Sequence, residues 1–343
     1  MSLQGYDIAY LASITEELSY NESTCEVFFK KVYDVNSMEA AKCIGITQPD
    51  SSIFPDIYRV HINDISRESL WKFMRYAHMP YLQSNIKVLQ DDFFVKLGAA
   101  YKKRDEMIEG MCRDNYEKYD KLMFHQKESA IEGFYKQKFV LALEQGLGKT
   151  LASIARSFFL KKKKTLVVCP AVAKYNWVDE LYEWGCAISD ITVVDKEKTR
   201  VSSTELFIVI NYDVLDKWLP ILKSKEIDHI ILDECHKVKN VKSIRNKVIN
   251  EISRAKKPTI TFLSGTPASN NVEDIFAYLE LSEHPLGSDK SLFLKKFTQQ
   301  VRLKNGDVKT IGANLEHLNI CISNLFFRRR KDVLSLPGKK YHK

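Results

Sequence analysis

The sequence lacks the features that mark secreted proteins, membrane-spanning proteins and proteins stabilised by a structural metal site. Its 343 residues include seven cysteines but no Cys-x-x-Cys pair, which argues against a disulfide framework and a structural zinc site and favours a reducing compartment. Its apolar runs are only as long as a strand, as at 207–210, and no signal peptide is evident. We therefore expect an intracellular protein. It would be cytoplasmic if it comes from a bacterium or a bacteriophage, and nuclear if it comes from a eukaryote.

The chain also lacks internal repeats, and its charge is unevenly distributed. Its length and its 45% apolar content are typical of a soluble protein with two domains. Residues 1–120 carry 14 Lys and Arg against 19 Asp and Glu; the totals are 52 and 44, so the remainder carries 38 against 25. A basic segment indicates a polyanionic partner such as nucleic acid, or a lysine-rich solvated surface, and charge alone leaves both interpretations open.

A glycine-rich segment lies between an apolar run and a helical pattern. Residues 139–143 are apolar, EQGLGKT follows at 144–150, and the helical pattern begins at residue 151. In this context Gly146 and Gly148 allow a tight turn whose amides face phosphate oxygens. Lys149 is then expected to reach the β- and γ-phosphates, and Thr150 to hold Mg²⁺. Leu143 stands where the full motif has a glycine, so this loop alone does not decide the function.

Two adjacent carboxylates follow another apolar run, at 230–232. Asp233 is placed to hold Mg²⁺ through its water shell, and Glu234 to orient and deprotonate an attacking water. By itself such a pair would more often be an acidic turn from a strand into a loop. Behind a phosphate-binding loop in an alternating α/β chain, it favours nucleotide hydrolysis.

Short apolar runs alternate with helical patterns from residue 139 onward. We expect strands at 139–143, 165–169, 191–194, 206–210, 229–232 and 259–263, with helices among them at 173–184 and 242–254. Strands that are apolar on both faces are typical of a parallel sheet covered by helices. Ligands of such sheets bind beyond the C-terminal ends of the strands.

Together the motifs resemble the first motor lobe of the Swi/Snf-type ATPases, superfamily-two helicases and translocases that track along double-stranded DNA. Five motifs between residues 122 and 338 carry the resemblance: the phosphate loop, the Asp-Glu-Cys-His box at 233–236 with its trailing lysines and asparagine, Leu-Ser-Gly-Thr-Pro at 263–267, the segments 166–170 and 175–177, and the arginine-rich segment 327–337. The Gly-Thr-Pro sequence favours DNA over RNA. The resemblance implies a RecA-like parallel sheet with helices on both faces, and the use of ATP and Mg²⁺.

The resemblance also implies roles for individual residues. ATP would be bound by Gln126, Gln145, Gly146, Leu147, Gly148, Lys149 and Thr150; Lys149 and Glu234 would be catalytic; Thr150 and Asp233 would hold Mg²⁺; His236, Ser264 and Thr266 would couple the γ-phosphate to lobe movement; and Lys174, Asn211, Tyr212, Lys237 and Lys239 would contact DNA. Gln126 would read the adenine edge, although it could simply open a helix. Ser264 and Thr266 could instead cap one, and Asn211 departs from the threonine common in the family.

Residues outside the motifs suggest the domain organisation. We expect an accessory α+β domain over 1–83, with strands at 25–33 and 58–62 and a helix at 67–79. A helical connector follows over 84–120, which Gly98 and Gly110 could divide. The ATP-binding lobe is expected over 121–327, with a hairpin turn at Asn305-Gly306, and the interlobe linker over 328–343.

The resemblance implies a second motor lobe whose arginines complete the ATP site. Such an arginine contributes roughly 10³–10⁵ in turnover. No segment of the given sequence supplies this lobe, which we expect to belong to a longer chain or, alternatively, to a partner in trans. The chain is then expected to bind ATP and double-stranded or branched DNA while hydrolysing slowly. Two other hypotheses stay open: an ATP-gated module that binds DNA or protein without hydrolysis, and a lobe of an RNA helicase.

Overall fold

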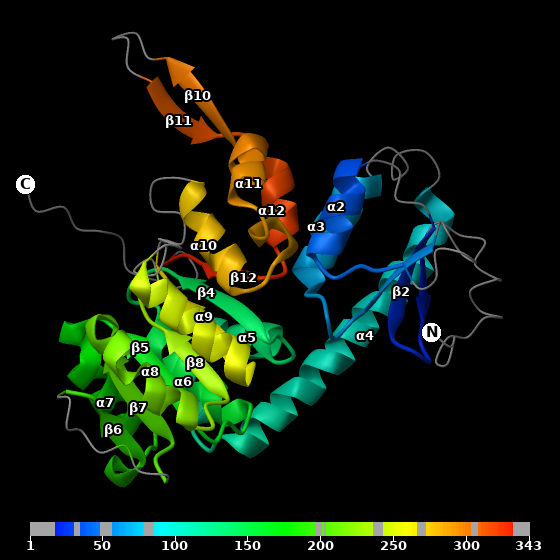
Figure 1. The fold of residues 1–343 in the computed structure, drawn as a ribbon. Helices are drawn as coiled ribbons and strands as arrows, with labels where there is room; N and C mark the ends of the chain where they lie inside the picture. Colours follow the sequence, from blue (N-terminus) through cyan, green and yellow to red (C-terminus); the bar gives the residue numbers. More distant parts are fainter. Residues whose placement is uncertain are drawn as a thin grey trace, which may run out of the picture. The chain divides into compact units, whose positions relative to one another are not determined.

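The computed structural model describes residues 18–30, 35–48, 57–78, 86–195, 201, 204–235, 243–265, 272–302 and 308–331. The chain divides into two compact units (Figure 1): Met1–Ile108 with Ala313–Leu325, and Glu109–Gly312 with Phe326–Lys343. The domain boundaries expected at 83 and 120 stay predictions, because this division falls between them. Among the described residues, no helix combines the length and the apolar character needed to cross a bilayer.

The first unit is built on a three-stranded antiparallel sheet. Its strands, in the order β1-β2-β3, are β1 (Leu18–Asn21), β2 (Glu26–Lys30) and β3 (Ile57–His61). Helices α2 (Val35–Cys43) and α3 (Arg67–His78) pack together with α12 (Leu315–Ile322), which comes from the far end of the sequence. The strands expected at 25–33 and 58–62 and the helix expected at 67–79 correspond to β2, β3 and α3; residues 31–33 and 79 lie outside the described residues.

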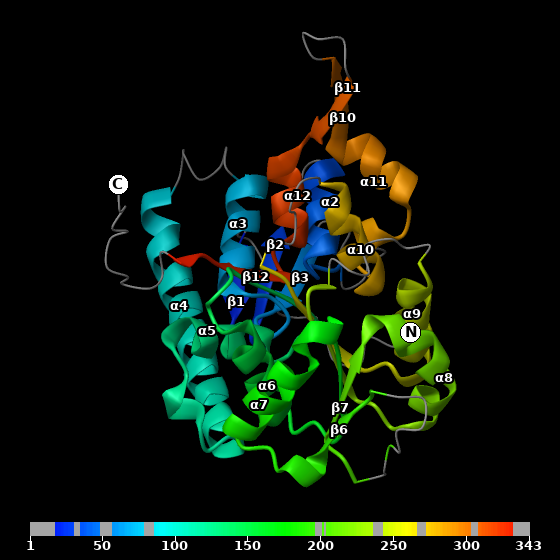
Figure 2. The ribbon, with the colours of Figure 1, turned by 90° about the vertical axis from the view of Figure 1, so that its left-hand side faces the viewer.

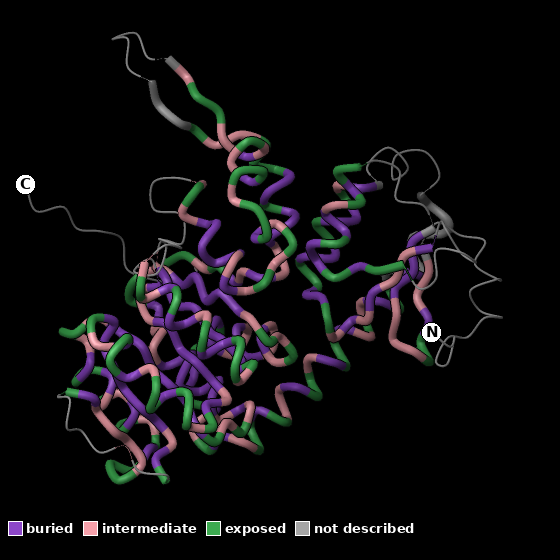
Figure 3. Tube along the Cα trace, viewed as in Figure 1, coloured by how far each residue is buried: buried purple, intermediate pink, exposed green. Residues whose placement is uncertain are grey.

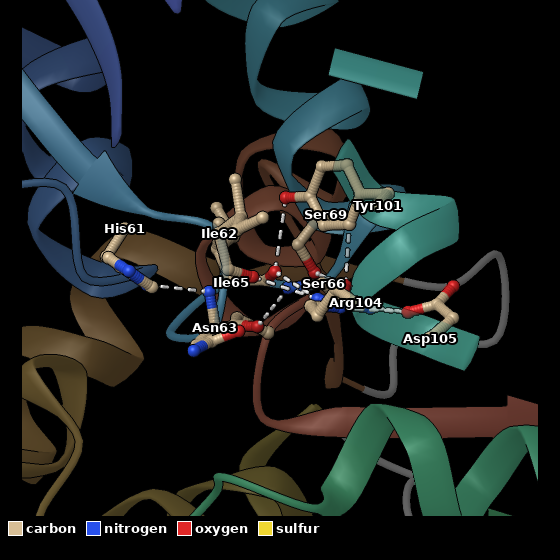
Figure 4. Close-up of polar contacts among 10 residues, drawn as sticks. His61, Ile62, Asn63, Ile65, Ser66, Ser69, Tyr101, Arg104 and Asp105 are labelled. Atoms are coloured by element: carbon tan, nitrogen blue, oxygen red, sulfur yellow. Dashed lines mark hydrogen bonds and ion pairs between the residues drawn. The ribbon is translucent and has the colours of Figure 1, made fainter. Parts of the chain in front are cut away.

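A buried arginine ties the long helix α4 (Ile86–Asn115) to the turn after β3. Nη1 of Arg104 donates hydrogen bonds to the carbonyl oxygens of Ile62 (2.9 Å) and Ile65 (3.3 Å), and Nε and Nη2 donate to Asp105 (Figure 4). The Tyr101 hydroxyl adds a bond of 3.2 Å to Ile65 from the same face of the helix. A buried guanidinium is tolerated here because its donors are satisfied.

Helix α4 is continuous, so the expectation that glycines could divide it was wrong. Gly98 and Gly110 both lie inside it. A glycine in a helix interior costs only about 1 kcal/mol of stability relative to alanine. The hydrogen bonds and packing along a helix of 30 residues stabilise it by more than that.

The second unit contains a seven-stranded sheet in which every pairing is parallel. Its order is β12-β4-β9-β8-β5-β7-β6. The strands are β4 (Lys138–Leu143), β5 (Thr165–Cys169), β6 (Ile191–Val193), β7 (Phe207–Asn211), β8 (His229–Leu232), β9 (Thr259–Leu263) and β12 (Phe326–Arg329). All residues of β5, β7, β8 and β9 are buried, which explains why these strands are apolar on both faces (Figure 3).

Helices cover both faces of this sheet. On one face lie α5 (Phe124–Gly133), α6 (Lys149–Phe159) and α7 (Lys174–Glu183); on the other lie α8 (Leu215–Ser224) and α9 (Ile244–Lys256) (Figure 2). This arrangement follows from right-handed crossovers, because the chain moves one way across the sheet through α6 and α7 and returns through α8 and α9. The predicted α/β class, with helices on both faces of a parallel sheet, is confirmed.

A β-hairpin extends from the second unit. After α10 (Glu273–Leu281) and α11 (Lys290–Phe297), β10 (Thr298–Arg302) pairs antiparallel with β11 (Val308–Gly312). Both ribbon views show the hairpin projecting beyond α11 (Figures 1 and 2). The predicted turn at Asn305-Gly306 lies outside the described residues, but the hairpin it was expected to close is present.

Candidate nucleotide-binding site

Three of the predicted motifs meet at one edge of the parallel sheet. The loop 144–148 follows β4, Ser264 and Gly265 follow β9, and Asp233 and Glu234 follow β8. Because β4, β9 and β8 are neighbours and parallel, their C-terminal ends lie side by side. This edge is where α/β sheets bind their ligands.

The loop after β4 has the backbone of a phosphate-binding loop. Gly146 and Gly148 have φ values of +87° and +69°, which residues with a Cβ rarely adopt. Gly148 is the N-cap of α6, so Lys149 and Thr150 form the first turn, where unpaired amides favour an anion. Leu143, which stands where the motif has its first glycine, is a fully buried residue at the end of β4, and the loop begins after it.

Lys149 lies between the loop after β9 and the acidic pair. A Cβ on Gly265 would lie 3.5 Å from Nζ of Lys149 and 3.6 Å from the backbone nitrogen of Gln145. The charge of Lys149 also acts to lower the pKa of Asp233. The glycine of the third motif therefore lies in van der Waals range of the lysine that is expected to bind phosphate.

Three neighbours fix the position of Asp233. Nε1 of Trp177, on α7, donates a hydrogen bond of 2.9 Å to its Oδ2. The Tyr212 hydroxyl donates to its carbonyl oxygen at 2.8 Å, and its own amide donates to Val168 of β5 at 2.8 Å. Burial raises the pKa of Asp233, while the Trp177 hydrogen bond opposes that rise. A partly buried carboxylate held this firmly is suited to a hard cation.

The donor set at this edge fits Mg²⁺. The Asp233 and Glu234 carboxylates and the Thr150 hydroxyl are oxygen donors, and all three residues are partly exposed. Glu234 has a φ of +48°, a left-handed conformation uncommon for a residue with a side chain. Such conformations cost roughly 1–3 kcal/mol and cluster at active sites. The next residue anchors this turn, because the buried Cys235 Sγ donates to the carbonyl oxygen of Leu263 at 3.0 Å.

Gln126 lies against the phosphate-binding loop. Its Oε1 accepts a hydrogen bond of 2.9 Å from the Met123 amide, which opens α5, and its Nε2 donates to the carbonyl oxygen of Gly148 at 3.4 Å. His125 Nε2 contacts the carbonyl oxygen of Leu147 at 2.9 Å. Gln126 therefore opens a helix and touches the loop at once, and its role in reading adenine stays a prediction.

The arginine-rich segment begins inside the sheet. Residues 328 and 329 were expected to start the interlobe linker, but they belong to β12, which pairs with β4. Arg329 bonds both carboxylate oxygens of Glu128, on α5, at 3.2 and 3.4 Å. The amide of Lys331 donates to Glu144 of the phosphate loop at 2.8 Å. The expectation failed because β12 pairs along only one edge and because arginines directly follow its two apolar residues, Phe326 and Phe327.

The described residues expected to contact DNA are engaged within the protein. Lys174 is buried, donates from Nζ to the carbonyl oxygen of Val194 at 3.0 Å and pairs with Asp195. Asn211 is buried, and the buried Tyr212 uses its hydroxyl on Asp233. This geometry does not support direct contact of their polar groups with a DNA backbone, since DNA contact requires exposed donors.

The other predicted residues are only partly described. His236, Lys237, Lys239 and Thr266 lie outside the described residues, so their roles stay predictions. Ser264 is buried, and its amide donates to the carbonyl oxygen of Leu141 at 3.3 Å. Sequence reasoning missed the parts played by Trp177, Tyr212 and Gly265. All three stood in recognised motifs, but their partners lie on other strands and helices.

Comparison with known proteins decides the family. The model of the SNF2-related domain matches residues 72–343, most of the chain. The chain belongs to the SNF2-related domain family. The predicted resemblance to Swi/Snf-type motors is therefore confirmed.

Individual relatives support the same assignment. The chain is 30% identical over 241 residues to "DNA repair and recombination protein RAD54" of Saccharomyces cerevisiae, covering 59% of this chain and 26% of that protein. It is 28% identical over 244 residues to human "DNA annealing helicase and endonuclease ZRANB3", covering 64% and 22%. The chain thus spans about a quarter of the length of these relatives.

A solved structure supports the fold of the second unit. The "SWI2/SNF2 ATPase core in complex with dsDNA" of Sulfolobus solfataricus matches with a TM-score of 0.50 and 26% identity, covering 61% of this chain and 44% of that one. The RecA-like character of the seven-stranded sheet is thereby confirmed.

Proposed function

We propose that this chain is the ATP-binding motor lobe of a DNA-dependent ATPase, a helicase or translocase that acts on double-stranded or branched DNA. One observation carries the proposal: the phosphate-binding loop, the acidic pair and Gly265 converge at the C-terminal edge of β4, β8 and β9. That convergence fits nucleotide hydrolysis and is unexplained by an acidic turn alone. The names of the relatives and the duplex bound in the related structure support DNA as the polymer.

In this proposal the residues of the edge divide the chemistry of ATP hydrolysis. The amides of the loop and Lys149 bind the β- and γ-phosphates, and Thr150 and Asp233 hold Mg²⁺, which neutralises phosphate charge when bound. Glu234 orients the attacking water and takes its proton as the water oxygen bonds to the γ-phosphorus. The bond from the γ-phosphorus to the bridging oxygen breaks, which leaves ADP and phosphate. Trp177 and Tyr212 keep Asp233 in place.

Full activity is proposed to need a second motor lobe. In phosphoryl transfer of this class, an arginine stabilises the charge on the transferring phosphoryl group. Such an arginine raises the rate of turnover by roughly 10³–10⁵-fold. The described edge holds Lys149 but no arginine among the residues that the three motifs bring together. The intracellular, reducing location expected from the sequence remains part of this proposal.

ATP turnover on different nucleic acids tests the proposal. Turnover should be measured without nucleic acid and with single-stranded DNA, duplex DNA, branched DNA and RNA, with Glu234→Gln as the blank. The series should use this chain alone and a chain that includes a second motor lobe. We expect slow, DNA-insensitive turnover from the chain alone, and stimulation by duplex or branched DNA when both lobes are present.

Other outcomes identify the competing functions. Stronger stimulation by RNA would favour an RNA helicase lobe. If both proteins bind ATP but neither hydrolyses it on any polymer, the motor function is wrong and an ATP-gated binding module replaces it. Nucleotide-dependent DNA binding without turnover would then be its positive signature.

A further inference from the structure

Three potential metal ligands cluster in the first unit, which contains none of the residues of the nucleotide site. Glu39 lies on α2, and His317 and Cys321 lie one helical turn apart on α12. One ligand atom from each residue lies within 4.8 Å of the others. Helices α2 and α12 run side by side, so the cluster joins segments from opposite ends of the sequence (Figure 1).

The spacing of the ligand atoms suits zinc. Sγ of Cys321 lies 3.6 Å from Nε2 of His317. In a tetrahedral site with Zn–N of about 2.0–2.1 Å and Zn–S of about 2.3 Å, these two atoms are about 3.5 Å apart. Oε2 of Glu39 lies 2.5 Å from Nε2, closer than the roughly 3.3 Å between two ligands of one zinc ion. The Glu39 side chain is 32% exposed, so it has room to withdraw.

The other nitrogen of His317 is held as in a metal site. Nδ1 lies 3.1 Å from the Tyr76 hydroxyl, on α3, and this contact directs Nε2 toward Glu39 and Cys321. Ligating histidines commonly use their second nitrogen in this way. Nε2 faces a carboxylate and a sulfur, so a proton or a cation must lie between these atoms.

Burial and charge favour a dication in this place. Cys321 is fully buried, and His317 is 6% exposed. Burying isolated charges is costly, but a thiolate and a carboxylate together balance the two positive charges of Zn²⁺. Thiolate, imidazole and carboxylate are all ligands that zinc accepts.

We propose that Glu39, His317 and Cys321 form a zinc site, with water in the fourth position, that fastens α12 to α2. Binding releases the thiol proton of Cys321 to solvent and leaves His317 neutral. The sequence interpretation argued against a structural zinc site because the sequence has no Cys-x-x-Cys pair. The signal it missed is a histidine and a cysteine at i and i+4 on one helix. This proposal does not depend on the ATP site.

Metal analysis of the purified chain tests the site. After expression with zinc and extensive buffer exchange, we expect about one zinc per chain. Cys321→Ser and His317→Gln should lose most of it, and Cys43→Ser, a matched change of a buried cysteine on α2, should keep it. Lys149→Ala should also keep it, which separates this metal from any bound with nucleotide. An absence of zinc from the wild-type chain, or equal zinc in all variants, would overturn the proposal.

Cobalt substitution keeps the test informative if a variant folds poorly. Co²⁺ added to the metal-free wild-type chain should give visible bands of a tetrahedral site and a near-ultraviolet thiolate-to-cobalt band. Glu39→Gln changes a partly exposed side chain, so it should fold, keep the thiolate band and bind zinc at least about tenfold more weakly. Tyr76→Phe should weaken zinc binding by about tenfold, as loss of such supporting contacts does. A wild-type chain without the thiolate band would identify the cluster as hydrogen-bonded only.

Discussion

Trp177 on α7 and Asp233 after β8 are joined by a hydrogen bond of 2.9 Å from the indole Nε1 to Oδ2 of the carboxylate. The two residues lie 56 positions apart in the sequence. The contact fixes one oxygen of the carboxylate that is expected to hold Mg²⁺. A residue named in a helix motif thus serves the metal side of the nucleotide site.

Trp177→Phe should impair the metal side of the site. The change keeps an aromatic ring but removes the donor, and outer contacts to metal ligands are worth about 10–100-fold in affinity or activity. We expect the Mg²⁺ concentration needed for half-maximal ATP turnover, in the two-lobe protein, to rise by about tenfold. Metal-free nucleotide affinity should change little. An unchanged Mg²⁺ dependence would show that the indole bond does not position Asp233.

Tyr212→Phe separates positioning of Asp233 from contact with DNA. The Tyr212 hydroxyl is buried and donates to the Asp233 carbonyl oxygen at 2.8 Å. Its removal should lower kcat severalfold, because the turn that carries both carboxylates loses a support worth about 1 kcal/mol. Duplex DNA affinity, measured by fluorescence anisotropy, should stay unchanged. Weaker DNA binding with normal turnover would instead support the family-based assignment of Tyr212 to DNA.

Gly148→Ala should weaken ATP binding. Gly148 has a φ of +69°, at which a residue with a Cβ is strained, and an added Cβ would lie 2.3 Å from Nε2 of Gln126, so the loop would be strained and the Gln126 side chain would have to shift away from it. We expect at least about a tenfold loss of affinity for a fluorescent ATP analogue, since the loop amides lose their alignment.

Gly98→Ala is the matched control for that change. Gly98 lies inside α4, and an added Cβ there meets nothing within 4 Å. Alanine favours a helix over glycine by up to about 1 kcal/mol, so this variant should be as stable as the wild type or slightly more stable. ATP affinity should be unchanged. Equal loss of ATP binding in both variants would argue against a specific role for the loop.

Much of the second unit could be predicted because its strands are buried on both faces. The runs 165–169, 229–232 and 259–263 were predicted with the ends that the structure has. Strand β12 could not be predicted in this way, because a parallel strand at the edge of the sheet needs no long apolar run. From the sequence, its two arginines were assigned to a linker, and only the pairing of β12 with β4 in the structure shows that they belong to a strand.

The chemistry of the site was predictable where it depends on neighbours in sequence. The left-handed Gly146 and Gly148 follow from the motif, and so does the strand that carries Asp233. Contacts made by folding were not predictable. Lys174 looks like a surface lysine, yet it is buried against Asp195. Trp177 reaches Asp233 only because β5, the strand before α7, pairs with β8 in the sheet.

A buried histidine should make stability depend on pH. His229 in β8 is fully buried between the Ser157 and Thr261 hydroxyls, each 2.8 Å from one of its ring nitrogens. Burial, and then the charges of Arg156 and Lys162, lower its pKa well below the ordinary value of 6.5.

The sign of the pH effect follows from proton uptake. Below pH 6.5 the unfolded chain binds a proton at His229 and the folded chain does not, so stability falls as the pH drops through this value. The slope contributed by one such group is at most about 1.4 kcal/mol per pH unit. His229→Asn should lower the free energy of unfolding at pH 7.5 by about 1–3 kcal/mol, because one hydroxyl loses its partner, and should flatten the loss between pH 6.5 and 5.

Urea unfolding at several pH values checks this prediction. The wild-type chain and His229→Asn should be compared with His61→Asn, which changes a partly exposed histidine of the first unit and should leave the pH dependence of the second unit in place. Tryptophan fluorescence reports on the second unit through Trp177 and Trp218, both buried there. If His229→Asn kept the full wild-type slope below pH 6.5, another group would be responsible for the acid sensitivity, and the neutral, buried state assigned to His229 would be wrong.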